Sequence, residues 1–164
     1  PEGAIIVDEA VTTRLGYRHF AHAAPPHTVL CITGGSLGLG LPCAVGAGLA
    51  CPERKVIAFE ADGSGMYTVQ ALWTMAREGL DITTLICANR RYRILQFEMA
   101  RAGIAEPGPR AQALTDLSGP NLDWVSLAKG FGIPGARVET ADALVTALER
   151  ALAEPGPALI EAIL

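Results

Sequence analysis

The sequence from residue 55 to residue 89 reads KVIAFEADGSGMYTVQALWTMAREGLDITTLICAN, and it predicts the central unit of the fold. Residues 55–61 and 82–88 form two apolar runs with the composition of buried strands. Between them, residues recur at the spacing of one helical face: Tyr67, Ala71, Leu72, Met75 and Ala76. The connection is too long for a hairpin and predicts two adjacent parallel strands joined by a helix, the repeating unit of an α/β fold.

One oxygen-bearing side chain follows each of these strands. Asp62 comes directly after the first strand and Asn89 directly after the second. Because parallel strands end at the same edge of a sheet, we expect both side chains at the edge where open α/β folds bind ligands. A carboxylate and an amide oxygen suit Mg2+, and the N–H groups of Gly63 and Ser64, at the start of the helix, can meet a phosphate. These residues predict a site for Mg2+ and a diphosphate.

Each half of this pattern also has a purely structural explanation. Asp-Gly-Ser is common in turns and helix caps, and Asn is common after a strand. The occurrence of both at the ends of two adjacent strands favours a binding site over two unrelated turns.

The same stretch resembles the thiamine diphosphate motif of 2-oxo acid enzymes, in which Gly-Asp-Gly is followed, after a helix and a strand, by Asn. Residues 62–76, DGSGMYTVQALWTMA, are similar to benzoylformate decarboxylase and the acetolactate synthase large subunit. The resemblance covers nearly the whole chain, but only the third, diphosphate-binding domain of those enzymes. It implies a three-layer α/β sandwich with a mostly parallel central sheet, a single domain over residues 1–164, and thiamine diphosphate and Mg2+ as cofactors.

The resemblance also implies roles for individual residues. Asp62, Asn89 and the backbone carbonyl of Arg91 would hold the metal. The residues implied in cofactor binding are Val11, Thr12, Gly35, Leu37, Gly63, Ser64, Asn89 and Tyr92. The carbonyl of Gly35 would accept the aminopyrimidine amine, and Leu37 would support the bent cofactor from beneath. Thr12 alone also fits a plain helix cap.

Residues 33–42 (TGGSLGLGLP) form a glycine-rich turn after an expected strand at residues 28–32. Its glycines let the backbone lie flat against a ligand. The turn contains no GxGxxG with an acidic partner for a ribose, so an ordinary nucleotide-binding domain is a weaker alternative. Further along, the arginines of residues 90–93 either lie in a solvated loop or help to neutralise a diphosphate.

The chain departs from the family pattern at three positions and in one larger respect. Ala61 replaces the first Gly of the motif, and Ala88 replaces the first Asn of an Asn pair. Arg93 replaces a Gly, and we expect its larger side chain to narrow the substrate side of the site. The essential Glu of the family, which protonates the aminopyrimidine ring, belongs to an N-terminal pyrimidine-binding domain, and neither that domain nor the middle domain is in this sequence. We therefore expect no catalytic residue in this chain, no turnover by it alone, and either a fragment of a longer enzyme or one subunit of a split enzyme.

The resulting hypothesis is a domain of an acetolactate synthase-like enzyme that decarboxylates or carboligates 2-oxo acids. Its expected partner is the pyrimidine-binding domain of the same or another chain, in a homodimer or tetramer. The apolar faces of the helices at residues 44–50 and 67–76 are the expected contacts between chains. The alternative is a binding or regulatory module that keeps the fold without catalysis.

Composition argues against several other classes. The net charge of −4 gives no support to nucleic-acid binding, and no apolar run has the character of a membrane span or a secretory signal. The four cysteines lack a CxxC pattern and indicate reduced core thiols of a cytoplasmic protein: Cys31, Cys43, Cys51 and Cys87. His19, His22 and His27 lie in an expected exposed loop, which disfavours a metal site there.

The N-terminal and middle elements follow from periodicity and turn residues. We expect a strand at residues 3–7 that ends on Asp8-Glu9, and helices at residues 10–20 and 94–103. Leu95 and Phe97, in the second of these helices, either line the substrate side or pack in the core.

The C-terminal third begins with residues 105–120, which are rich in loop formers and are the best candidate for a mobile lid. Trp124 and Leu127 are expected in the core, within a short helix at residues 121–131. Thr140 is expected to cap a helix that ends at residue 153 and precedes a final strand at residues 157–164. The predicted buried face of that helix is Ala143, Leu144, Ala147, Leu148 and Ala151.

Overall fold

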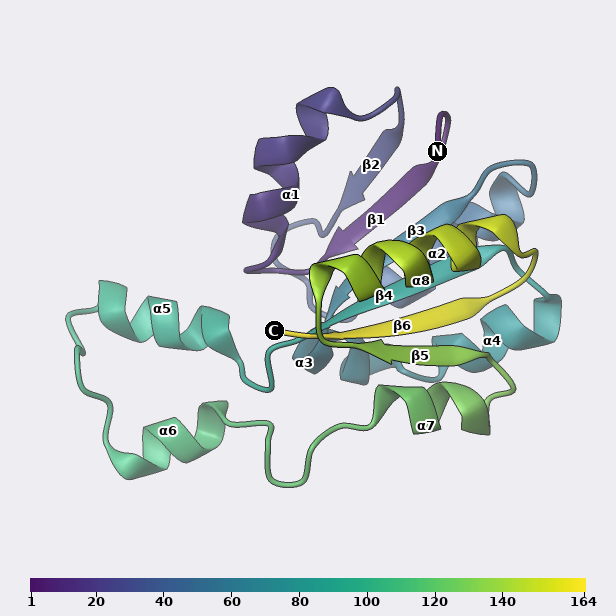
Figure 1. Ribbon diagram of the computed structural model, residues 1–164. Helices are drawn as coiled ribbons and strands as arrows, with labels where there is room; N and C mark the ends of the chain where they lie inside the picture. Colours follow the sequence, from purple (N-terminus) through teal and green to yellow (C-terminus); the bar gives the residue numbers. More distant parts are fainter.

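The computed structural model describes all 164 residues and contains one six-stranded sheet (Figure 1). The strand order is β2-β1-β3-β4-β6-β5, and every neighbouring pair is parallel. The strands are β1 Ile5–Glu9, β2 Thr28–Cys31, β3 Val56–Ala61, β4 Ile82–Ala88, β5 Gly135–Val138 and β6 Ala158–Ile163. The predicted α/β fold is confirmed, and the sheet is wholly rather than mostly parallel.

Helices cover both faces of the sheet and produce three layers (Figure 1). On one face lie α2 (Gly40–Ala50), α4 (Ala71–Glu78) and α7 (Trp124–Gly130). On the other lie α1 (Arg14–Phe20), whose Tyr17 packs edge-on against Phe59 of β3, and α8 (Ala141–Ala153). The short elements are η1 Ala21–Ala23, α3 Asp62–Gly65 and η2 Met66–Thr68.

Two further helices, α5 (Arg93–Arg101) and α6 (Pro109–Thr115), stand away from the sheet (Figure 1). We call residues 93–115 the α5–α6 arm. No residue of α5 is buried, and Thr115 is the only buried residue of α6. The arm therefore adds little to the core of the domain.

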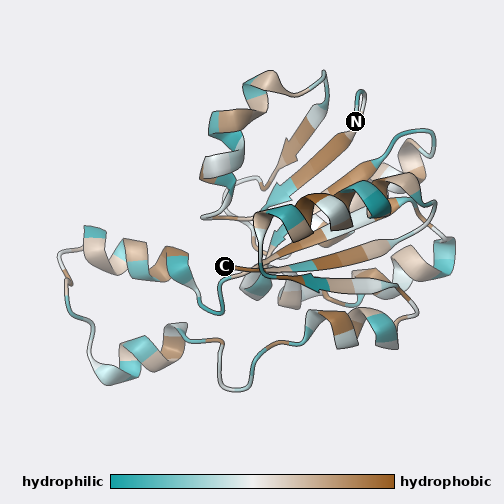
Figure 2. Ribbon diagram, in the orientation of Figure 1, coloured by the Kyte–Doolittle hydropathy of each residue, from teal (hydrophilic) through white to brown (hydrophobic).

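The main core lies between the sheet and the layer of α2, α4 and α7. Its largest fully buried apolar members are Trp124, Leu41, Leu72, Met75, Ile82, Ile86 and Leu159. A smaller cluster under α8 contains Val138, Ala151, Ile160 and Ala162. Because both faces are covered, the central strands are apolar along most of their length (Figure 2).

Several predicted core and cap residues are confirmed. Trp124 is fully buried, and Leu127 is partly buried against the same cluster. The hydroxyl of Thr140 caps α8 by accepting the N–H of Ala143 at 3.2 Å. Ala143 itself is exposed, contrary to the prediction, whereas the other four predicted positions are buried or partly buried.

The first segment differs from the prediction. β1 continues to Glu9, so Asp8 and Glu9 are paired strand residues beside Phe59 and Glu60 of β3. The helix begins at Arg14 instead of residue 10, because Val11 has a φ of 50°, which lies in the left-handed region and cannot belong to a right-handed helix.

Two more predictions need correction, and one strand was missed. Tyr67 does not lie on a buried helical face: it falls in η2 and is 59% exposed, because α4 begins only at Ala71. Residues 105–120 are not loop throughout, because α6 begins there at Pro109, a residue suited to the first turn of a helix. The edge strand β5 was not predicted, since three of its four residues are exposed and carry no buried-strand pattern.

The cysteines are all free, as expected, but they are not all in the core. Cys31 is exposed because it lies on the edge strand β2, every residue of which is exposed. Cys43 and Cys51 are partly buried, and Cys87 is buried.

Helix length and hydropathy also bear on the question of a membrane span. None of the helices combines the length with the apolar character needed to cross a lipid bilayer.

Candidate functional site

A pocket lies where the chain reverses its direction across the sheet. From β1 the chain moves outward to β2, and it then returns to the other side of β1 to form β3. Such a reversal opens a crevice at the carboxyl ends of the strands. The residues that line the pocket are Val11, Thr12, Leu37, Ala61, Asp62, Gly63, Ser64, Asn89, Arg91, Tyr92, Arg93 and Ile94.

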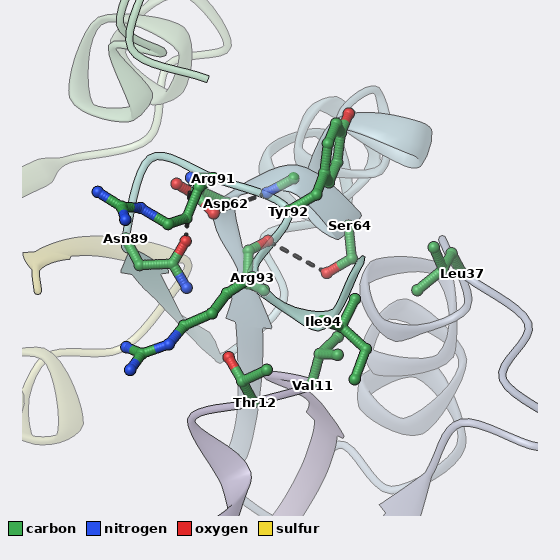
Figure 3. Close-up of a pocket in the computed structure, with 12 residues that line it drawn as sticks. Val11, Thr12, Leu37, Asp62, Ser64, Asn89, Arg91, Tyr92, Arg93 and Ile94 are labelled. Atoms are coloured by element: carbon green, nitrogen blue, oxygen red, sulfur yellow. Dashed lines mark hydrogen bonds between the residues drawn. The ribbon is translucent and has the colours of Figure 1, made fainter. Parts of the chain in front are cut away.

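The pocket brings together all the predicted site residues except Gly35. In Figure 3, Asn89 and Arg91 lie on one side of the pocket and Leu37 on the opposite side, with Ser64 between them. Gly35 is exposed, two positions before Leu37 in the glycine-rich turn, and does not line the pocket. The sequence did not single out Ile94 as a site residue, and an apolar residue at a helix start carries no signal by which to find it.

Asp62 is held in place by backbone donors. Its side chain is almost fully buried, at 2% exposure, and accepts the N–H of Gly63 at 2.9 Å and the N–H of Arg90 at 2.6 Å. Arg90 has a φ of 58°, a left-handed conformation that turns the chain after β4. Burial raises the pKa of Asp62, while the N–H donors of Arg90 and Gly63 oppose that rise. The ends of β3 and β4 are thus joined through this carboxylate.

Asn89 and Arg91 complete the set of oxygen atoms at this edge. The Oδ1 atom of Asn89 accepts the N–H of Arg91 at 3.1 Å, which folds the chain back after β4 in an Asx turn. No three His, Cys, Asp or Glu side chains in the chain are grouped to hold a metal ion. A metal at this edge must therefore use mixed donors. One carboxylate, one amide oxygen and one backbone carbonyl are all hard oxygen ligands, and this donor set fits Mg2+.

Gly63 and Ser64 form the floor of the pocket beside Asp62. A Cβ on Gly63 would come within 2.5 Å of the Tyr92 ring, so only glycine permits Tyr92 to close this side. The Ser64 hydroxyl donates to the carbonyls of Glu9 and Ala61, both at 3.2 Å, and this fixes the start of α3. The glycine and the serine of the motif therefore each have a structural reason that does not depend on a ligand.

The walls of the pocket carry a positive charge. Among the lining residues, Asp62 is the one acid, and Arg91 and Arg93 are the two bases. Neither arginine forms an ion pair with any acid of the chain, and the Arg93 guanidinium lies 5.5 Å from the centre of the Phe97 ring. The lining has a formal charge of +1 in a chain of net charge −4, so the pocket favours an anion.

Two residues predicted near this site lie elsewhere. Leu95 and Phe97 are 49% and 43% exposed and line neither the pocket nor the core. The histidines do not form a metal site, because His27 is hydrogen-bonded to the Tyr17 hydroxyl at 2.6 Å and to the carbonyl of Pro25 at 2.7 Å.

A pair of buried carboxyl groups beneath the pocket was missed by sequence reasoning. Glu9 and Glu60 are neighbours across β1 and β3, and both are 0% exposed. Burial and the nearby charge of Glu9 raise the pKa of Glu60 well above its usual value. The signal in the sequence is an acid at an inward position of an otherwise apolar strand, in phase with Val56 and Ala58.

Comparison with known proteins identifies the family. Residues 11–162 match the model of the thiamine pyrophosphate enzyme, C-terminal TPP binding domain. The chain belongs to this family. Its thiamine diphosphate-binding fold and its resemblance to acetolactate synthases and benzoylformate decarboxylases are therefore confirmed.

Individual relatives agree with this assignment. A Mycobacterium tuberculosis protein named as an acetolactate synthase large subunit is 47% identical over 164 residues, which cover 99% of this chain and 32% of the relative. Benzoylformate decarboxylase from Pseudomonas aeruginosa is 37% identical over 161 residues, which cover 98% of this chain and 29% of that protein. The chain thus spans less than a third of the length of these relatives.

A solved structure shows the same arrangement of elements. The thiamine diphosphate-dependent 4-hydroxybenzoylformate decarboxylase of Rhodococcus jostii superposes with a TM-score of 0.85 at 34% identity, over 99% of this chain and 30% of that chain. The structural match therefore extends over nearly the whole of this chain.

Proposed function

We propose that this chain is the diphosphate- and metal-binding domain of a thiamine diphosphate-dependent enzyme that decarboxylates or carboligates 2-oxo acids. The observation that carries this proposal is the pocket at the carboxyl ends of β1, β3 and β4. It gathers Asp62, Asn89 and Arg91 with the start of α3 between positively charged walls.

In this proposal the pocket residues divide into two groups. Asp62, Asn89 and the carbonyl of Arg91 bind Mg2+ through oxygen. The diphosphate and the rest of the cofactor are bound by Val11, Thr12, Gly35, Leu37, Gly63, Ser64 and Tyr92. When bound, thiamine diphosphate supplies carbanion stabilisation at the reacting carbon. The chain itself orients the cofactor and neutralises its charge.

We also propose that the complete site includes a second domain. No carboxyl group of this chain other than Asp62 lines the pocket, so the acid that acts on the aminopyrimidine ring must come from a pyrimidine-binding domain of the same or another chain. Exposed apolar side chains support such an assembly: Leu49 of α2 is 57% exposed and Trp73 of α4 is 50% exposed. On this proposal the 164-residue domain is inactive alone and works in a homodimer or tetramer.

The test is calorimetry of thiamine diphosphate binding, with Mg2+ and with a chelator in its place. Unaltered protein is expected to bind with Mg2+ and to lose at least about tenfold in affinity without it, a change of about 1.4 kcal/mol. Asp62→Ala should abolish the dependence on Mg2+, whereas Asp142→Ala, an exposed acid in the first turn of α8, should not change it. Unchanged affinity in a folded Asp62→Ala protein would sink the metal assignment.

A non-catalytic module is the second candidate, and the observation that favours it is Arg93. This side chain lines the pocket at a position where the resemblance implies a Gly, so it takes up room on the substrate side. The two candidates separate when a pyrimidine-binding domain that carries the essential Glu is added. Turnover of a 2-oxo acid supports the enzyme, and cofactor binding without turnover supports the module.

A further inference from the structure

The glycine-rich turn at residues 33–39 carries Leu37 to the pocket, but it has no regular structure of its own. It connects β2 to α2, and Gly34, Gly35 and Gly38 all have positive φ values. Leu37 is 41% exposed and lines the pocket opposite Asn89 (Figure 3). We therefore expect contacts from outside the turn to fix how far the Leu37 side chain reaches into the pocket.

Glu9 supplies such a contact. It is the last residue of β1 and is fully buried. Its Oε1 atom accepts the N–H of Gly38 at 2.6 Å, and its Oε2 atom accepts the N–H of Gly40 at 2.5 Å. Hydrogen bonds from N–H groups to a carboxylate are stronger than those between neutral groups. One side chain thus binds two backbone positions on the C-terminal side of Leu37.

Two other residues confine the turn from below and from the side. A Cβ on Gly40 would lie 1.8 Å from the Oε1 atom of Glu60, so the backbone at Gly40 rests directly on this second carboxyl group. Neither carboxyl oxygen of Glu60 has a hydrogen-bond partner. From the other side, the Thr68 hydroxyl donates to the carbonyl of Gly38 at 3.0 Å. The peptide groups of Gly38 are therefore held at both the N–H and the carbonyl.

We propose that Glu9 is a positioning residue that sets how far Leu37 reaches toward the cofactor. The inference rests on the proposed function, and it goes beyond it by assigning a role to a residue that does not line the pocket. Glu9 also lies two residues before Val11, which forms another wall of the same pocket. The end of β1 therefore fixes the distance between two walls that come from different parts of the chain.

The experiment separates the diphosphate from the remainder of the cofactor. Affinities of the 164-residue chain for inorganic diphosphate and for thiamine diphosphate are measured with Mg2+, and their ratio reports the contacts to the thiamine portion alone. In Glu9→Gln one acceptor oxygen becomes a donor, so one of the two N–H groups loses its partner. Diphosphate affinity should stay within about twofold, and thiamine diphosphate affinity should fall about tenfold.

A double-mutant cycle tests whether Glu9 acts through Leu37. In a Leu37→Ala background, Glu9→Gln should lower the ratio by less than about twofold, because the side chain that it positions is gone. Independent, multiplicative losses would overturn the inference. An unchanged ratio in Glu9→Gln would also overturn it and leave the proposed function intact. If the unaltered chain binds neither ligand, the proposed function and the inference both fail.

Loss of folding is controlled by two further variants. Thr68→Val removes only the bond to the Gly38 carbonyl and should lower the ratio about threefold. If Glu9→Gln does not fold, an unchanged ratio in Thr68→Val would overturn the inference. Glu161→Gln is the matched control, since Glu161 of β6 is 2% exposed, lies two strands from β3 in the sheet and pairs with Arg137 of β5. It should lower thermal stability without changing the ratio, and a changed ratio would show that any buried charge has this effect.

Discussion

The ends of β3 and β4 that carry Asp62 and Asn89, which we call the pocket edge, come just before the α5–α6 arm in the chain. The two regions differ in burial and in hydrogen bonding. At the pocket edge, Asp62 is buried and both of its carboxylate oxygens accept backbone N–H groups. In the arm, Leu114 is 78% exposed and Ile104 is 48% exposed, and the two helices share a cavity of about 400 Å³. The Gln96–Thr115 hydrogen bond joins the two helices of the arm to each other, and the N–H of Tyr92 donates to the carbonyl of Thr115 at 2.8 Å where the arm meets the domain.

This difference shows which part of the site is preformed. Hydrogen bonds and packing of the domain itself hold the oxygen ligands at the strand ends. The arm, in contrast, carries apolar side chains that the domain does not cover. A sheet edge held by its own hydrogen bonds next to an uncovered arm supports the proposal that the site is completed against another surface.

The largest effect should separate the two regions by stability. Leu72→Ala, at a fully buried position of α4, should lower the free energy of unfolding by about 2–5 kcal/mol through lost burial and a cavity. The matched change Leu114→Ala in the arm should alter it by less than about 0.5 kcal/mol. Urea denaturation measures both, and a large loss at Leu114 would show that the arm belongs to the cooperative core.

A smaller effect is expected from Asn89. Asn89→Ala should weaken Mg2+-dependent thiamine diphosphate binding about tenfold, because a neutral amide oxygen contributes less than the charged Asp62 carboxylate to a divalent ion. Gln112→Ala, which removes an exposed amide from the arm, should leave binding unchanged. Titration calorimetry gives both values, and a greater loss at Asn89 than at Asp62 would contradict this order.

The buried Glu60 should make stability depend on pH. Its pKa is raised in the folded state, so the folded protein holds this proton more tightly than the unfolded chain does. The stabilisation is complete below the unfolded pKa near 4.5 and is lost as the pH rises toward the folded pKa. Glu60→Gln should therefore be more stable than unaltered protein at pH 8, by about 1 kcal/mol or more, and nearly equal to it at pH 4. Thermal melts of both proteins from pH 4 to pH 8 measure this difference. If the melting temperatures of the two proteins depend on pH in the same way, the raised pKa of Glu60 is refuted.

The smallest change concerns thiol reactivity and leaves stability untouched. Burial raises the pKa of Cys87 to about 12, whereas Cys31 is exposed on the edge strand β2. A disulfide reagent at pH 8 should therefore label Cys31 first and Cys87 only on unfolding, because the thiolate is the reactive form. Cys31→Ser should remove the fast phase of labelling. Rapid labelling of Cys87 in folded protein would show that the end of β4 becomes exposed without unfolding of the whole domain.

Agreement between sequence and structure is closest where local signals are strong. The run at residues 82–88 became β4 residue for residue, because a strand covered on both faces is mostly apolar. Agreement fails at residues 8–13 and in the arm. Asp8 and Glu9 have the composition of a turn but pair within β1, and Pro109 follows loop-forming residues but starts a helix.

The strand–helix–strand unit and the placement of Asp62 and Asn89 at one edge follow from the sequence alone, because adjacent parallel strands necessarily end on the same side of the sheet. The burial of Glu9 and its hydrogen bonds to the N–H groups of Gly38 and Gly40, some thirty positions away in the chain, follow instead from the tertiary structure. A buried carboxylate is tolerated only where donors surround it, and the folded backbone supplies those donors. The same applies to the arm, whose apolar side chains, such as Leu95 and Leu114, lie where this chain does not cover them.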